Sequence, residues 1–263
     1  MRRREDSRNA GRPQAPILVG GPPFRPLDAG PLLEPLRASA DLSLNEGVLL
    51  SAEQCRALEL RQVQVKEAFT LTDAGGTWFR ASLRECGPRG GRALVYERMP
   101  AAPESPLAIT LLCAVLARQR MLVLMQKATE LGVAHIVPVY STASVQREGL
   151  DHEKWHGWPG QVLRACKQCR RSSVPSLRAP LPLAGALELP GWQAAERRLV
   201  LDDVEGAAAD WTSARPRTLA LAVGPEGGWT EAERSLLREA GGEVLRLGGA
   251  IHDVAQVAGA GQT

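Results

Sequence analysis

Apolar runs separated by amphipathic stretches dominate the second half of the chain. The runs lie at 107–112, 134–140, 198–201, 219–223 and 243–247. Because a strand that is covered on both faces has few polar positions, these runs predict buried strands. Residues 121–131 instead have a helical pattern that stops before Gly132, and glycine is favoured just after a helix. This alternation predicts an α/β fold, a parallel sheet with helices on both faces.

The preceding part of the chain has shorter runs and more glycine turns. Strand-like runs at 67–73, 77–83 and 92–97 are separated by turns at 74–76 and 87–91. This spacing predicts an antiparallel meander within a small barrel or sheet. Pro100, Pro103 and Pro106 follow it and predict a linker.

The start of the chain shows little periodicity and is rich in Pro, Gly and Arg, so we expect it to be largely irregular, with one short strand at 17–19. The patterns therefore predict three parts: an irregular segment at 1–46, a small β domain at 47–102 and an α/β domain at 103–263.

The stretch from Thr218 to Thr230 combines a buried strand, a glycine turn and the start of a helix. The apolar run leads into Gly224-Pro-Glu-Gly-Gly228, and Thr230 with Glu233 has the spacing of a capping box. Backbone N–H groups in such a turn can face a ligand without side chains in the way. A purely structural turn explains the pattern equally well. The spacing is neither the dinucleotide fingerprint nor a P-loop, which disfavours a diphosphate ligand.

A second glycine turn, Leu247-Gly248-Gly249, follows the last predicted strand. Ligands of parallel sheets bind outside the carboxyl ends of the strands. Two such turns side by side could hold a flat, mostly apolar ligand such as adenosine through backbone groups.

Residues 161–171, with the sequence QVLRACKQCRR, contain four basic side chains and no acid. Val162, Cys166 and Cys169 recur there at helical spacing, with Pro159 near the expected helix start. The basic side chains either form a solvated helix face or contact the phosphates of a nucleic acid. The two cysteines lack a second ligand pair at zinc-site spacing, so we expect no metal.

Composition limits the possible classes of protein but does not indicate a function. Hydrophobic residues make up 44% of the 263 residues and charged residues 23%, as in ordinary globular proteins. The formal net charge of +3 permits a nucleic-acid partner without requiring one. Five scattered cysteines suit a reducing compartment. With no apolar run long enough for a membrane span and no secretory signal, we expect a cytoplasmic protein.

Several motifs occur together in an order that is characteristic of one family. They are ESPLAIT at 104–110, QKATELGV at 126–133, IVP at 136–138, ACKQC at 165–169 with Arg171 and VP at 174–175, GPEGG at 224–228 and LG at 247–248. EAFTLTD at 67–73 and TWFRASL at 77–83 extend the set. Over roughly residues 48–249 the chain resembles the ribosomal RNA small subunit methyltransferase E family of the SPOUT superfamily.

The resemblance implies a PUA-like β-barrel for RNA docking, followed by a SPOUT-type parallel sheet with a deep trefoil knot. It implies a homodimeric enzyme of the small ribosomal subunit that uses S-adenosylmethionine to methylate N3 of a uridine in 16S rRNA. By position, the residues of the S-adenosylmethionine loops would be Leu201, Gly224, Pro225, Glu226, Gly227, Gly228, Leu247, Gly248, Gly249 and Ile251. The candidate RNA contacts are Lys127, Arg164 and Arg171.

Uridine N3 carries a proton at neutral pH, so the reaction needs a proton acceptor. Glu226 is the carboxylate of the glycine turn and the candidate base, with a structural role in capping nearby N–H groups as the alternative.

The chain also departs from the family pattern. Ala143 stands where the family usually has an arginine, Leu122 replaces an acid, Arg170 replaces a glycine, and the Arg-x-Glu-Thr element expected after Leu247 is missing. If the C-terminus is the native one, we expect reduced or absent activity. The alternative function is therefore a degenerate paralogue that binds RNA or ribosomes without methyl transfer.

Overall fold

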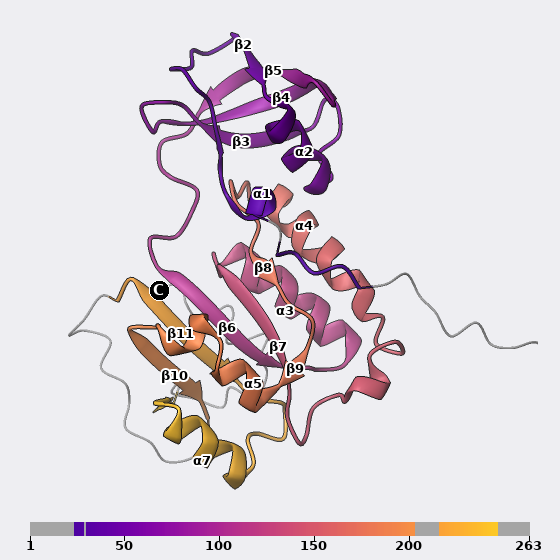
Figure 1. The fold of residues 1–263 in the computed structure, drawn as a ribbon, viewed down its shortest axis with the longest axis vertical. Helices are drawn as coiled ribbons and strands as arrows, with labels where there is room; N and C mark the ends of the chain where they lie inside the picture. Colours follow the sequence, from indigo (N-terminus) through magenta and orange to yellow (C-terminus); the bar gives the residue numbers. More distant parts are fainter. Residues whose placement is uncertain (1–23, 29, 203–215, 247–263) are drawn as a thin grey trace, which may run out of the picture.

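Two β-sheets organise the computed structural model, which describes residues 24–28, 30–202 and 216–246 (Figure 1). The smaller sheet lies above the larger one in Figure 1, and an extended linker joins β5 to β6 along one side. The larger sheet contains the candidate site.

The larger sheet is parallel throughout, as the apolar runs predict. Its strand order is β12-β10-β11-β6-β7-β8, with β9 also paired to β7. The strands are β6 Ala108–Ala114, β7 His135–Tyr140, β8 Ser176–Leu177, β9 Leu181–Pro182, β10 Arg197–Leu201, β11 Thr218–Val223 and β12 Glu243–Leu245. The five strands expected from the apolar runs are confirmed as β6, β7, β10, β11 and β12.

Helices cover both faces of this sheet. Leu111 and Cys113 of β6 pack in the core beneath α3 and α4, whereas Leu112 between them packs in the core beneath α5, α6 and α7. Successive strand residues point to opposite faces, so a strand buried on both sides must be apolar throughout. The helices are α3 Arg118–Glu130, α4 Trp158–Gln168, α5 Leu183–Leu187, α6 Pro190–Gln193 and α7 Glu231–Glu239, with short 3-10 turns η1 Arg147–Gly149 and η2 Trp155–Gly157.

The predicted helix ends are confirmed. Gly132 follows α3 with a φ of 84°, a backbone conformation that glycine adopts without strain. Pro159 lies in the first turn of α4, where a missing N–H costs nothing. Thr230 and Glu233 form the expected capping box at the start of α7.

The smaller sheet has the order β1-β3-β4-β5-β2. Its strands are β1 Leu36–Arg37, β2 Gly47–Leu50, β3 Ala68–Thr72, β4 Trp78–Gly87 and β5 Gly90–Arg98. The predicted antiparallel meander is confirmed in β3, β4 and β5. Among the pairings of the described residues none joins β1 to β2, so this sheet is open rather than a closed barrel.

Four elements of this part were not expected: β2 and the three described next. Helix α1 Gly30–Leu33 and strand β1 lie in the segment predicted to be irregular, and β1 pairs in parallel with β3. Helix α2, Ala52–Leu60, packs Cys55, Ala57 and Leu58 into the core of the small sheet. The sequence does hold a signal for α2, because Ser51 and Gln54 form a capping box.

Some expectations lie outside the described residues: the strand at 17–19, the turn at Leu247–Gly249, Ile251 and the knot that the last segment would form. In the parts of the chain that are described, no helix has the length and apolar character needed to cross a membrane.

Candidate functional site

The segments that follow β6, β7, β10 and β11 meet at one edge of the larger sheet, because all four strands are parallel. The residues 224–228, which we call the glycine loop, leave β11 at this edge. Asp202 follows β10, Ser141 follows β7, and α3 begins shortly after β6. The strand order therefore places the glycine loop between the ends of β10 and β6.

Trp229 holds the glycine loop against β10. Its indole is 2% exposed, and its Nε1–H donates to the Leu201 carbonyl at 3.3 Å. A Cβ on Gly224 would lie 3.0 Å from the Trp229 ring, closer than ordinary packing allows. A side chain at position 224 would therefore require this indole or the loop to shift.

The loop itself presents mostly backbone. Gly228 has a φ of 74°, which favours glycine, and its N–H donates to the Pro225 carbonyl at 2.8 Å. Glu226 and Gly227 are exposed. A Cβ on Gly227 would lie 3.6 Å from the Ala143 methyl group. On the side of the β7 end, the glycine loop therefore faces the uncharged side chain of Ala143.

Glu226 forms an ion pair with Arg120 in the first turn of α3. Both side chains are about half exposed, at 45% and 47%. The pair orients the only carboxylate of the glycine loop, and it reaches from β11 to the helix that follows the neighbouring strand, β6.

A second ion pair lies beneath the loop. Arg234 of α7 donates from Nε and Nη2 to the two carboxylate oxygens of Asp202, at 2.7 and 3.3 Å. The Asp202 side chain is only 1% exposed, and Arg234 Nη2 is 3.8 Å from where a Cβ on Gly228 would lie. Two-point contact fixes the guanidinium plane, so the pair sets the position of α7 relative to the end of β10.

Glu233 joins α7 to the loop after β7. Its Oε2 accepts from the Thr230 N–H at 2.8 Å, and its Oε1 accepts from the Thr142 N–H at 2.7 Å. Burial alone would raise the pKa of Glu233, but these N–H donors and the two threonine hydroxyls hold it below its ordinary value. The carboxylate is therefore ionised at neutral pH and caps two segments at once.

Ser141 offers an unused polar group at the same edge. The residue is 5% exposed, and among the described residues its Oγ has no hydrogen-bond partner. Buried polar atoms are normally paired, so this hydroxyl still lacks the partner that such a position calls for. Together with loop backbone and the ionised side chains, it could orient a flat ligand that carries a few polar groups.

Three basic side chains of the segment 161–171 form ion pairs with acids outside this segment. Lys167 donates to Glu67 at 3.0 Å and Arg170 to Glu97 at 3.2 Å, and both acids belong to the small β domain. Arg171 is bound by Glu104 of the linker at 2.8 Å, with its side chain 5% exposed. Three of the four cations are therefore neutralised within the protein.

Of the three candidate RNA contacts, Arg164 and Lys127 remain accessible. Arg164 is exposed and donates only to Gln161 among the described residues. Lys127 is 45% exposed and pairs with Glu130 at 2.7 Å. Arg171 also donates to the Thr129 and Val133 carbonyls at the end of α3, at 3.2 and 2.8 Å, so its guanidinium is fully engaged by the protein.

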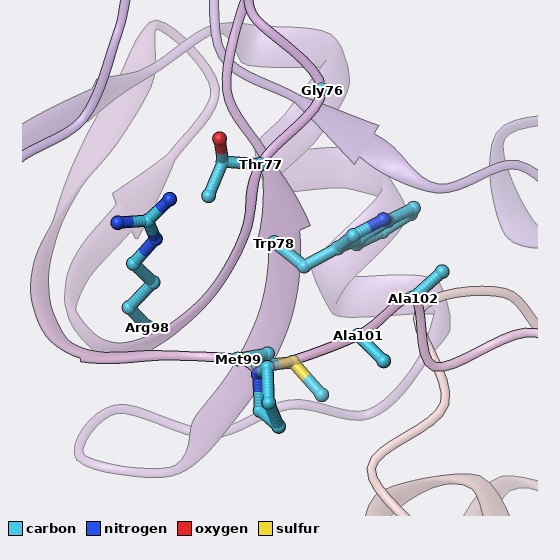
Figure 2. Close-up of a pocket in the computed structure, with 8 residues that line it drawn as sticks. Gly76, Thr77, Trp78, Arg98, Met99, Ala101 and Ala102 are labelled. Carbon is cyan, nitrogen blue, oxygen red and sulfur yellow. The ribbon is translucent and has the colours of Figure 1, made fainter.

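A hollow of about 380 Å³ lies in the small β domain beside the linker, away from this edge (Figure 2). Thr77 and Arg98 lie on one side of its strand backbone and Trp78 on the other. Because the Trp78 ring and the Arg98 guanidinium lie on opposite sides of the strand backbone, the hollow does not bring them together around one ligand.

The cysteines do not form a metal site in the described part of the chain, where no group of three or more His, Cys, Asp or Glu side chains gathers. Burial raises the pKa of the Cys166 thiol to about 12, so it stays protonated at neutral pH.

Sequence reasoning missed Arg120, Thr142, Asp202 and Arg234. Arg120 and Asp202 follow predicted strand ends, which is where ligands of parallel sheets bind. Their position after a predicted strand end could therefore have identified both residues as candidates. Nothing in the sequence pairs Thr142 with Glu233 or Asp202 with Arg234, since each pair is distant in the chain.

Comparison with known proteins identifies relatives of this chain by sequence. A family model described as RNA methyltransferase domain matches residues 103–251. Ribosomal RNA small subunit methyltransferase E of Aquifex aeolicus is 28% identical over 196 residues, covering 74% of this chain and 82% of the relative. The protein of the same name from Mycobacterium bovis is 27% identical, covering 74% and 76%.

A solved structure has the same arrangement of elements. The ribosomal RNA small subunit methyltransferase E of Neisseria gonorrhoeae, bound to S-adenosyl methionine, superposes with a TM-score of 0.57 at 28% identity. The match covers 86% of this chain and 94% of that one.

Proposed function

Because the chain belongs to the RNA methyltransferase domain family, we propose that it transfers a methyl group from S-adenosylmethionine to N3 of a uridine in 16S rRNA. The observation that carries the proposal is the glycine loop, fixed by Trp229 against the end of β10 at the carboxyl edge of a parallel sheet. A solved relative with a similar overall fold contains S-adenosyl methionine, and its name specifies small-subunit ribosomal RNA.

The described residues fit this cofactor. The backbone of Gly224, Pro225, Glu226, Gly227 and Gly228 and the end of β10 at Leu201 would hold the adenosine part. The packing of Trp229 against Gly224 favours the absence of a side chain there, and the Ser141 hydroxyl is buried without a partner among the described residues. Leu247, Gly248, Gly249 and Ile251 would complete the site. When bound, S-adenosylmethionine supplies an electrophilic methyl group on a sulfonium.

The protein has to place the uridine in line with that methyl group and to accept the N3 proton. Glu226 is our candidate for the acceptor, since it is the exposed carboxylate of the glycine loop, and Arg120 orients it. No covalent intermediate is needed, because a sulfonium is already an activated methyl donor.

The RNA would be held by Arg164 and Lys127, whose side chains are accessible, and by the small β domain at 47–102, which we take as a PUA-like docking domain. Arg171 contributes by holding the linker rather than by phosphate contact. The proposed working form is a cytoplasmic homodimer with a knotted methyltransferase domain at 103–263 and no metal.

Titration calorimetry with S-adenosylmethionine tests the cofactor part of the proposal. We expect saturable binding to the wild-type chain and at least tenfold weaker binding to Gly224→Ala. Absence of binding to the wild-type chain would exclude this cofactor and with it the proposed reaction.

A second candidate function follows from Ala143, which places a methyl group opposite Gly227. The family usually has an arginine at this position, so the uncharged alanine favours a protein that binds RNA or ribosomes without methyl transfer. This alternative predicts salt-dependent RNA binding and no methylated product, and methylation at an ordinary rate would eliminate it.

A further inference from the structure

The two domains meet at residues 170–173, between α4 and β8, and this segment contacts both the small β domain and the linker. We call these contacts the domain junction: Arg61, Thr70, Glu104 and residues 170–173. Arg61, the residue that ends α2, is 7% exposed and donates from Nη1 to the Ser172 carbonyl at 2.8 Å. Its Nη2 donates to the Glu34 carbonyl.

Arg61 stays charged in this buried position. Desolvation by burial lowers the pKa of Arg61 to about 10, which leaves the guanidinium protonated at neutral pH. A lysine could not reproduce its contacts, because one guanidinium spans two carbonyls that belong to different segments. Arg61 therefore fixes the end of α2 against both the chain that enters the small domain and the larger domain.

Glu104 binds the same segment from the linker. Its Oε1 accepts from the Ser172 N–H at 2.8 Å, the Ser173 N–H at 3.0 Å and the Ser172 hydroxyl at 3.0 Å. Its Oε2 accepts from Arg171 Nη2 at 2.8 Å and Nε at 3.1 Å. Burial would raise the pKa of Glu104, but Arg171 and the N–H donors lower it, so the carboxylate is ionised at neutral pH.

The core strand β3 adds a third contact to this segment. Thr70 Oγ1 donates to the Arg170 carbonyl at 3.0 Å and accepts from Arg80 Nη1 at 2.9 Å. Arg170 has a φ of 64°, an uncommon backbone conformation for a residue with a side chain. Helix, strand and linker thus converge on four residues of the larger domain.

These contacts are better suited to setting an orientation than to adding stability. Two domains of one chain move relative to each other by default unless a large apolar interface joins them. Buried charges contribute little net stability compared with apolar packing, because desolvation offsets their attraction. Directional bonds to three separate parts of one segment do, however, exclude other relative orientations of the two domains.

We propose that Arg61 and Glu104 are positioning residues that hold the small β domain at the angle at which one RNA molecule contacts both domains. This rests on the proposed function, since it assigns the RNA a surface shared by the small domain and by Arg164 on α4. Neither residue lies at the glycine loop, so cofactor binding is not expected to depend on them.

The test compares Arg61→Met, Arg61→Lys and Glu104→Gln with the matched control Arg56→Met. Arg56 is exposed on the same helix and has no side-chain hydrogen bond or ion pair among the described residues. For each variant we would measure the KM for 16S rRNA, the Kd for S-adenosylmethionine and the radius of gyration by small-angle scattering.

We expect Arg61→Met and Glu104→Gln to raise the KM for RNA at least tenfold and to increase the radius of gyration. The Kd for S-adenosylmethionine should stay within twofold, Arg61→Lys should be intermediate, and Arg56→Met should match the wild type. An unchanged KM, or a KM and cofactor Kd that rise together, would overturn the proposal.

If the proposed function is wrong, the same variants give a different set of measurements. If the wild-type chain binds no S-adenosylmethionine, the reaction is excluded, but scattering and the Kd for RNA by fluorescence anisotropy still compare the variants. Under that outcome the junction is supported by weaker RNA binding with a larger radius of gyration, and it is refuted if both stay at the wild-type values.

Discussion

Arg120 and Glu226 form an ion pair that connects the first turn of α3 to the glycine loop. The two residues are far apart in the chain and meet because β11 and β6, which precede them, are neighbours in the parallel sheet. The pair therefore depends on the strand order, and it places a carboxylate and a cation together at the edge where a ligand of such a sheet binds.

The carboxylate of Glu226 can be tested directly. Glu226→Gln keeps the side-chain shape but removes the proposed proton acceptor, and general-base catalysis contributes about 10²-fold or more to a rate. We expect methyl transfer to fall by that factor while the Kd for S-adenosylmethionine stays within about twofold, measured by tritiated methyl transfer and calorimetry. Glu239→Gln, at an exposed position on α7, is the control. A wild-type rate for Glu226→Gln would leave Glu226 only its structural role.

Gly224→Ala tests the packing of the glycine loop. The new methyl group would lie 3.0 Å from the buried Trp229 ring, so the indole or the loop must move. We expect cofactor affinity to fall at least tenfold and the tryptophan fluorescence to shift. Gly157→Ala is a matched control, since a Cβ there meets nothing within 4 Å. Equal affinities for the two variants would show that the loop does not line the site.

Asp202→Ala tests the buried ion pair beneath the loop. Removing one partner of a buried pair costs about 3–5 kcal/mol, and the lower end, about 3 kcal/mol, applies here because Arg234 keeps Glu231 at 3.7 Å as a second, exposed partner. We expect the free energy of unfolding in urea to fall by that amount for Asp202→Ala. The double variant Asp202→Leu with Arg234→Met should recover most of the loss because it removes both charges. A single-variant effect below about 0.5 kcal/mol, typical of surface positions, would contradict the buried geometry.

Glu233→Gln tests the cap that joins α7 to the β7 loop, and the effect depends on pH. The pKa of Glu233 is lowered in the folded protein, so its contribution is complete above its ordinary value of 4.5 and is lost as the pH falls through the folded value. We expect a loss of about 1 kcal/mol at neutral pH, typical of a helix cap. The difference between wild type and variant should shrink below pH 4.5 in urea unfolding. A constant difference across pH would show that the charge is not responsible.

Local patterns predicted five strands of the larger sheet, the meander of the smaller sheet and helices α3, α4 and α7. The pairing of residues far apart in the chain could not be predicted in this way. The runs that became β6 and β11 are apolar because both faces are covered, and that signal is contained in the residues themselves. The basic residues Lys167, Arg170 and Arg171 could not be assigned in this way. Their partners Glu67, Glu97 and Glu104 lie far earlier in the chain, and only the docking of the two domains brings them together.

In the glycine loop, too, local features follow from the sequence and contacts between distant residues do not. Its backbone character and the Thr230–Glu233 cap follow from the sequence, whereas the contact of Trp229 with Leu201 depends on β10 and β11 being neighbours. The departure at Ala143 can be seen in the sequence, whereas its position opposite Gly227 follows only from the structure.

The most direct test of the central claim is mass spectrometry of nucleosides from 16S rRNA. The rRNA would come from a bacterial strain that lacks its own uridine-N3 methyltransferase and expresses this chain, with Glu226→Gln expressed in parallel. We predict N3-methyluridine at one position with the wild-type chain and at least tenfold less with the variant. Unmethylated rRNA from cells that contain the folded wild-type protein would contradict the account and favour an RNA-binding protein without methyl transfer.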